Sequence, residues 1–171
     1  LRYDADAYPA VVGGKVVWIL DAYTTSSRYP NAQAANVSQL TPGSGLSANF
    51  NYVRNSVKVV VDAYSGAITM YVVDAKDPIA ATWAKAFPKL FTPVSEASAE
   101  LVSHFRYPED LFRVQTNIYG RYQFTDPTLF FNRDAAWSVA QAPPSEPDGA
   151  TGIVGTAGTA LNPDLIDVQD A

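Results

Sequence analysis

The spacing of apolar residues changes between Val73 and Asp77, and this change constrains the fold more than any other feature of the sequence. Before it, residues 8–20 and 57–73 show the short apolar runs and period-two alternation of β-strands. After it, apolar residues recur every three or four positions, as they do in amphipathic helices. The sequence therefore predicts an α+β fold, with two antiparallel β-hairpins in one sheet followed by about four helices packed on one face.

Turn residues set the expected pairing of both hairpins. In the first hairpin, Gly13-Gly14 form a two-residue turn that can adopt positive φ. In the second, Ser65-Gly66 are the expected turn. Pairing outward from Ser65-Gly66 predicts three apolar pairs on one face: Ala63 with Ile68, Val61 with Met70, and Val59 with Val72. The other face then carries mostly polar residues, namely Lys58, Asp62, Thr69 and Tyr71.

Helix starts are predicted from capping signals. Asp77 and Asp126 each precede a proline, so both suit the N-cap position of a helix with proline at its first position. Replacing either aspartate by alanine should then cost about 1 kcal/mol of stability. Ser95 is expected to cap a further helix through His104.

The segment Arg106-Tyr107-Pro108-Glu109-Asp110-Leu111-Phe112 opens the longest predicted helix. Glu109 and Asp110 lie in the first turn, where the helix dipole favours negative charge. Glu109 and Arg113 have the favourable i,i+4 order for an ion pair. We prefer this charged first turn to an acid–base pair, because the helix dipole already accounts for both carboxylates.

Composition excludes several classes of protein. The 171 residues are 47% hydrophobic and 17% charged, as expected of about one globular domain. The net charge is −5 and the basic residues are scattered, which argues against a nucleic-acid partner. The longest apolar runs fall far short of the roughly 20 residues that a membrane-spanning helix needs. The chain has no cysteine, which excludes disulfide and thiolate chemistry.

No residue is assigned a catalytic, cofactor-binding or metal-binding role. His104 is the only histidine, so zinc binding and a Ser-His-Asp triad both lack support, and surface pairing with Glu100 is preferred. Candidate acidic pairs lack the spacing of a calcium loop or have a simpler role as caps or strand-end charges; they are Asp4 with Asp6, Asp74 with Asp77, and Asp62 with Asp74. Gly43-Ser44-Gly45 lacks the context of a phosphate loop.

Aromatic residues make up 12% of the chain, and five tyrosines cluster around the predicted strands and loops: Tyr23, Tyr29, Tyr52, Tyr64 and Tyr71. They could form a binding platform for sugar or peptide, or an ordinary core of half-buried tyrosines, which is preferred.

The expected organisation is one α+β domain over residues 1–140, with a loop-rich insertion at 31–56. Residues 141–171 have the Pro/Gly/Ala-rich composition of a linker or flexible tail. The chain begins at Leu1 without methionine and runs directly into globular-looking sequence, which we expect of a segment cut from a longer protein.

Eight short motifs together resemble the uncharacterised bacterial protein family zero-one-eight-two over roughly residues 3–137. The motifs are, in chain order, Tyr8–Val12, Trp18–Pro30, Asn51–Lys58, Val61–Gly66, Phe87-Pro88, Arg106–Phe112, Thr125–Pro127 and Phe131–Arg133. The resemblance implies a parent protein with several N-terminal membrane helices and a long domain outside the membrane. No activity is established for that family, so no catalytic residue carries over.

From this resemblance we predict a non-catalytic binding or assembly domain outside the cytoplasm, within a multi-pass protein of the cell membrane. The alternative is an envelope-acting hydrolase whose active site needs other parts of the parent. The expected partner is the remainder of the parent, with a homo-oligomer as a further option. The chain should be soluble without detergent yet expose apolar surface along the Trp18 strand.

Overall fold

The computed structural model describes residues 1–132, except 38–39, 41–42, 47–48 and 123. Two compact units, Leu1–Tyr119 and Gly120–Ala171, are described separately. The strands are β1 (Arg2–Tyr3), β2 (Tyr8–Val12), β3 (Lys15–Ser26), β4 (Tyr52–Asp62), β5 (Ile68–Val72) and β6 (Phe91–Pro93). The helices are α1 (Pro78–Ala86), α2 (Ala99–Ser103), α3 (Glu109–Tyr122) and α4 (Pro127–Asn132), with a 3-10 turn at Val94–Glu96.

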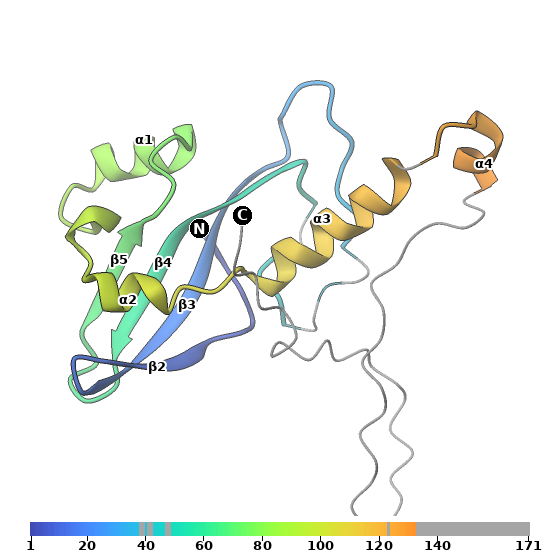
Figure 1. Cartoon of the computed structure of the whole chain (residues 1–171). Helices are drawn as coiled ribbons and strands as arrows, with labels where there is room; N and C mark the ends of the chain where they lie inside the picture. The colour runs from blue at the N-terminus through green and yellow to red at the C-terminus, as the bar shows by residue number, and fades with distance from the viewer. Residues whose placement is uncertain (38–39, 41–42, 47–48, 123, 133–171) are drawn as a thin grey trace, which may run out of the picture. The chain divides into compact units, whose positions relative to one another are not determined.

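One six-stranded sheet contains all of these strands, in the order β1-β3-β4-β5-β6 (Figure 1). Strand β2 also pairs with β3, so β1 and β2 share one edge of β3 and leave its other edge to β4. All pairs are antiparallel except β5 with β6. The α+β class is confirmed, as are the two hairpins in one sheet and the helices that follow them.

The first hairpin has the predicted turn. Gly13 and Gly14 have φ of 56° and 73°, and they join β2 to β3 so that Val12 lies opposite Lys15. Positive φ at both positions belongs to the two-residue turn whose twist matches that of the flanking strands.

The second hairpin has the predicted face but a different register. Val61 lies opposite Ile68 and Val59 opposite Met70, so the expected pairing is wrong by two residues. The turn is longer than Ser65-Gly66 because the Asp62 carboxylate accepts hydrogen bonds from the backbone N–H groups that follow it, at 2.9 and 2.7 Å. A shift of two residues preserves the side-chain alternation, so the same apolar residues still share one face.

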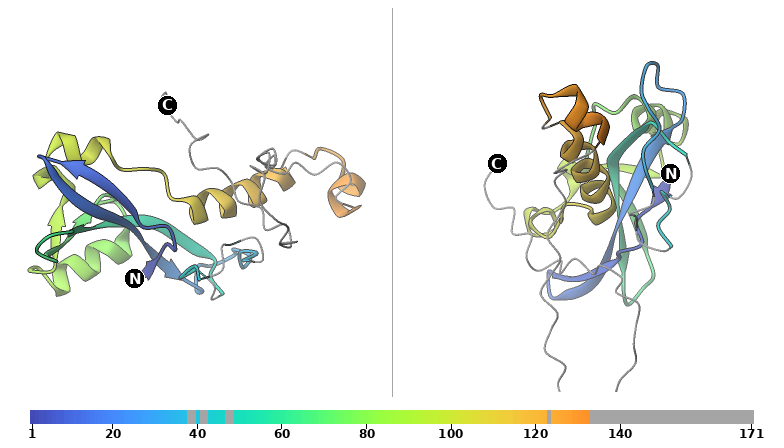
Figure 2. Two further views of the ribbon diagram at one scale, coloured as in Figure 1. Left: turned by 90° about the horizontal axis from the view of Figure 1, so that it is seen from below. Right: turned by 90° about the vertical axis from the view of Figure 1, so that its right-hand side faces the viewer.

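Helices α1 and α2 lie on opposite faces of the sheet, which corrects the expectation that the helices share one face (Figure 2). On one face, Leu101 of α2 packs in a core cluster with Ile19 and Val60. On the other face, Asp77 at the start of α1 accepts a hydrogen bond from Thr24. Ile19 and Thr24 lie five residues apart on β3, where side chains alternate, so the two helices pack on opposite sides.

Three of the four helix starts agree with the capping signals. α1 begins at Pro78 with Asp77 as its N-cap, α3 begins at Glu109 directly after Pro108, and α4 begins at Pro127. The exception is α2, whose N-cap is Ser98 and not Ser95, because the Ser98 hydroxyl accepts a hydrogen bond from the N–H of Leu101 at 3.1 Å.

The loop between β3 and β4 ends earlier than predicted, since β4 begins at Tyr52 within the expected insertion. Part of this loop pairs with the edge of the sheet, where the Gly45 N–H donates a hydrogen bond to the carbonyl oxygen of Tyr3 at 2.9 Å. The predicted tail, 141–171, lies outside the described residues.

Gly45 should tolerate no side chain. A Cβ atom at this position would lie 2.4 Å from the backbone oxygen of Tyr3, a contact that only a backbone shift can relieve. We expect Gly45→Ala to lower the free energy of unfolding by about 1 to 3 kcal/mol, measured by chemical denaturation. Gly43→Ala is the control for the loop, because a Cβ at that site has no neighbour within 4 Å, although its φ of 93° adds backbone strain. An unchanged stability for Gly45→Ala would refute the close approach.

Candidate functional site

Both predicted aspartate caps are confirmed, but they have different surroundings. The exposed Asp126 carboxylate accepts hydrogen bonds from the N–H groups of Thr128 and Leu129, at 2.7 and 3.3 Å. Asp77 is fully buried and caps α1 through the N–H groups of Ile79 and Ala80.

The Asp77 carboxylate also joins α1 to the sheet. It accepts hydrogen bonds from the hydroxyls of Thr24, Ser56 and Tyr52, at 2.5, 2.6 and 2.7 Å. Burial acts to raise the pKa of Asp77, but the donated hydrogen bonds outweigh it and hold the pKa below its usual value. Burial and the hydrogen bond to Asp77 raise the pKa of Tyr52 to about 12.

The other acidic candidates have local partners. Asp62 lies in the β4–β5 turn, whereas Asp74 lies beyond the opposite end of that hairpin and pairs with Arg54 at 2.9 Å. The structure therefore does not bring Asp62 and Asp74 together. His104 ends α2 with its side chain exposed, and its backbone oxygen accepts a hydrogen bond from Tyr8.

A buried ion pair lies in the middle of the sheet. Lys58 on β4 and Asp21 on β3 are opposite residues in the register, and both side chains are almost fully buried. Asp21 also accepts a hydrogen bond from the Asn55 amide at 2.9 Å. Burial raises the pKa of Asp21, opposed by the Lys58 ammonium.

The segment that opens α3 is fixed on top of this ion pair. Lys58 donates a hydrogen bond to the backbone oxygen of Arg106 at 2.6 Å. The N–H of Arg106 donates to the Tyr8 hydroxyl at 3.0 Å, and its guanidinium lies 4.7 Å from the Tyr8 ring centre. The predicted Glu109–Arg113 pair is present beside it, with both side chains partly buried. This motif therefore has a clear structural role.

Two carboxylates, Asp4 and Asp21, approach each other in this interior, and the charge of Asp4 adds to the rise that burial causes in the pKa of Asp21. Asp4 accepts a hydrogen bond from the Tyr23 hydroxyl, and Asp21 is bound to Lys58. Both carboxylates are buried and both are engaged by these partners, so they lack the open cleft of a hydrolytic acid–base pair. Within the described ranges, no group of three or more acidic or histidine side chains is placed to hold a metal ion.

The tyrosines do not converge on one platform. Tyr23 is buried in the core, Tyr29 and Tyr52 stack on each other at 5.7 Å, and Tyr64 is 99% exposed at the turn after β4.

An exposed apolar surface is the strongest candidate for a functional site. It lies on the face of the sheet that bears α1, near the two hairpin turns. We call it the open face and define it by Pro9 and Val11 of β2, Val16 and Trp18 of β3, Val61 of β4, and Ile68 of β5. The strand register makes it continuous, since Pro9, Trp18, Val61 and Ile68 are opposite one another in turn.

The exposed fractions of these side chains are large for apolar residues in strands. They are 59% for Val11, 48% for Val16, 45% for Trp18 and 63% for Ile68. On the other side of the same strands, Ile19 is fully buried in the cluster that contains Leu101 of α2. The prediction that apolar surface is exposed along the Trp18 strand is therefore confirmed.

Comparison with known proteins places the chain beside a set of longer proteins. The family described as "Uncharacterised protein family (UPF0182)" matches residues 1–157. A UPF0182 protein of Methanospirillum hungatei is 50% identical over 81% of this chain, and one of Leifsonia xyli is 45% identical over 85%. A further relative from Rhodococcus jostii is 45% identical over 94%. The chain spans only 15 to 17% of the length of these relatives. No solved structure matches.

Proposed function

The chain belongs to the uncharacterised protein family UPF0182, and we propose that it is a non-catalytic assembly domain of a multi-pass membrane protein. In this proposal the domain lies outside the cytoplasm, and its open face packs against the remainder of the same protein. The single observation that carries the proposal is the exposed apolar surface that runs across four strands.

The physical argument starts from the cost of leaving this surface in water. Burying apolar surface contributes about 25 cal/mol per Å², and contiguous exposed patches in single domains mark interaction sites. Valine, tryptophan and isoleucine side chains on β2, β3 and β5 form such a patch without an intervening charged residue.

The length of the relatives supports the remainder of the same protein as the occupant. Because the chain spans about 15% of the first relatives, most of a full-length protein is available to cover the open face in cis. A second copy of the domain is the competing occupant. No helix among the described residues is both long and apolar enough to cross a membrane, and the spanning segments in our proposal belong to the remainder of the protein.

Replacing Ile68 by serine tests the assembly role. Because Ile68 is 63% exposed, we expect Ile68→Ser to change the stability of the 171-residue chain by less than about 1 kcal/mol. In the full-length protein the same change should loosen the packing of the domain, detected as faster limited proteolysis. Tyr64→Ser is the matched control, since Tyr64 is exposed but lies outside the open face.

Equal proteolysis of the Ile68→Ser and unaltered full-length proteins would reject the assembly role. A concentration-dependent dimer of the full-length protein that Ile68→Ser dissociates would instead identify a second copy as the occupant.

The location is tested separately by labelling a single cysteine in intact cells. Tyr64→Cys introduces a highly exposed thiol, in a segment that has no cysteine of its own. With any cysteines elsewhere in the full-length protein replaced, a membrane-impermeant maleimide should label it without cell lysis. Labelling only after lysis would place the domain in the cytoplasm.

A further inference from the structure

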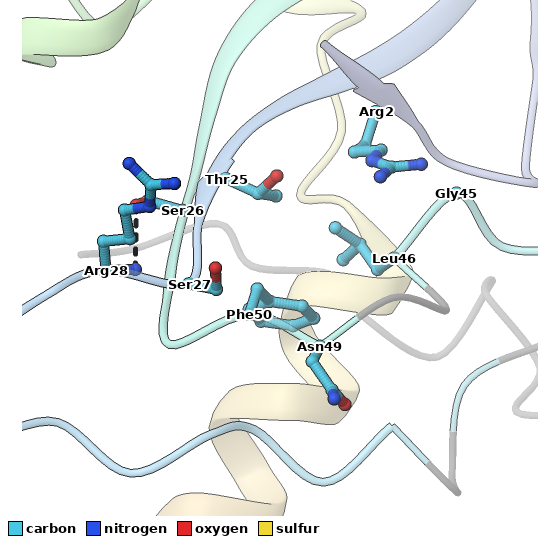
Figure 3. A pocket seen from close by; sticks show the side chains of 9 residues that line it. All are labelled: Arg2, Thr25, Ser26, Ser27, Arg28, Gly45, Leu46, Asn49 and Phe50. Atoms are coloured by element: carbon cyan, nitrogen blue, oxygen red, sulfur yellow. Dashed lines mark hydrogen bonds between the residues drawn. The ribbon is translucent and has the colours of Figure 1, made fainter.

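A polar pocket of about 290 Å³ lies at the end of β3, away from the open face. Its wall includes two arginines, Arg2 and Arg28, with the hydroxyl residues Thr25 and Ser27 between them (Figure 3). Its apolar base is provided by the buried side chains of Leu46 and Phe50, and Ser26, Gly45 and Asn49 complete the lining.

The sheet places the two arginines on the wall of one pocket from distant parts of the sequence. Arg2 is opposite Tyr23 in the β1–β3 register, which places it on the side of the sheet that carries Tyr23 and Thr25. Arg28 follows β3, and its N–H donates a hydrogen bond to the Ser26 hydroxyl at 3.1 Å. Both arginine positions are therefore fixed through the backbone of the sheet or of the turn beside it.

Two described parts of the surrounding loop are also held in place. Asn51 accepts a hydrogen bond from the N–H of Tyr29 and donates to its carbonyl oxygen, at 3.0 and 2.8 Å. On the opposite wall, the bond between Gly45 and Tyr3 ties the loop to β1. A pocket whose walls are already ordered binds its ligand with a smaller entropic cost.

The charge of the pocket contrasts with that of the chain. Among the residues that the structure describes, no aspartate or glutamate lines it, although the whole chain has a net charge of −5. Within the described ranges, the ion pairs involve Arg54, Lys58 and Arg113, and neither Arg2 nor Arg28 pairs with a carboxylate. Two cations that have no partner anion among the described residues, beside several hydroxyl groups, are suited to an anionic ligand.

We propose that this pocket binds a phosphate ester. Each guanidinium presents a planar set of N–H donors that matches the oxygens of a phosphate group, and the hydroxyls of Thr25 and Ser27 supply further donors. Leu46 and Phe50 then contact the carbon skeleton of the ester. The phosphate group comes from a soluble phosphate ester or from a phospholipid headgroup, which share this chemistry. This inference does not depend on the proposed assembly role, because none of its residues belongs to the open face.

Isothermal titration of the 171-residue chain with glycerol 3-phosphate tests the proposal. We expect saturable binding at one site, weakened about tenfold or more by Arg2→Gln and by Arg28→Gln, because each change removes charge-assisted hydrogen bonds. Arg54→Gln is the matched control, since Arg54 lies outside the pocket, and it should alter the affinity by less than about twofold. Circular dichroism of each variant reports whether the fold is retained.

Vesicle sedimentation distinguishes the two sources. Binding to phosphatidylcholine vesicles is compared with and without phosphatidic acid. The lipid headgroup is identified as the ligand if binding requires phosphatidic acid and both pocket arginines, and if glycerol 3-phosphate does not bind. The proposal is overturned if neither ligand binds saturably, if acetate binds as tightly as the phosphate ester, or if Arg54→Gln weakens binding as much as the pocket variants do.

Discussion

Replacing Asp77 by alanine is expected to lower the free energy of unfolding by about 3 to 5 kcal/mol, several times the cost of losing a helix cap alone. The fully buried carboxylate accepts three hydroxyl and two backbone hydrogen bonds. Its removal leaves the buried donors of Thr24, Ser56 and Ala80 without their acceptor and separates the start of α1 from β3 and β4. Chemical denaturation at neutral pH measures the change.

Asp126→Ala is the matched control, because the exposed Asp126 only caps α4, and it should cost about 1 kcal/mol. If Asp77→Ala costs no more than Asp126→Ala, the bonds to the sheet contribute nothing.

The Asp77 carboxylate should also make the stability of the chain depend on pH. Because the folded-state pKa of Asp77 is held below its usual value, its stabilising contribution is complete above the unfolded-state pKa of about 4 and is lost as the pH falls through the folded-state pKa. Asp77→Asn should therefore lose less stability than the unaltered chain between about pH 5 and pH 2.

Breaking the buried ion pair is the second change with a large expected effect. Lys58→Met leaves the Asp21 carboxylate buried without its ammonium partner, and we expect a loss of about 3 to 5 kcal/mol. The double variant Asp21→Leu with Lys58→Met replaces both charges by apolar groups and should recover most of that loss. A double variant as unstable as Lys58→Met would contradict this account of the pair.

The pH dependence of Lys58→Met distinguishes an unpaired charge from a simple loss of packing. Burial raises the pKa of Asp21, and Lys58 opposes that shift. A carboxyl whose folded-state pKa is raised binds a proton more readily in the folded chain. Stability is therefore lost as the pH rises from the unfolded-state pKa to the folded-state pKa. Lys58→Met should thus become more stable as the pH falls from neutral toward the unfolded-state pKa of about 4, whereas the double variant should not.

The local parts of the fold could be predicted because their signals lie in adjacent residues. Gly13-Gly14 and the two Asp-Pro pairs determine a turn and two helix starts through backbone geometry alone. The pairing predicted for the second hairpin is wrong by two residues, because the Asp62 side chain binds the backbone of its own turn and lengthens that turn. Which face each helix covers depends on contacts between distant segments, which periodicity does not encode.

The buried contacts of Asp77 and Lys58 could not be predicted from the sequence for a related reason. The bulge in β4 opposite Ala22 and Tyr23 leaves Ser56 unpaired in the register, and its hydroxyl then reaches Asp77. Lys58 was placed on the correct, polar face of the hairpin. Its burial against Asp21 follows only from the pairing of β3 with β4, two strands that a long loop separates in the sequence.

Cysteine labelling at Ile68 tests the central claim, that the open face is covered by the rest of the protein, most directly. The rate of maleimide reaction is measured for Ile68→Cys in the 171-residue chain and in the full-length protein, relative to Tyr64→Cys in each. Our account predicts rapid labelling at both positions in the short chain, and protection of position 68 but not 64 in the full-length protein. Equal reaction rates at position 68 in the two proteins would show that the open face remains in water and would contradict the account.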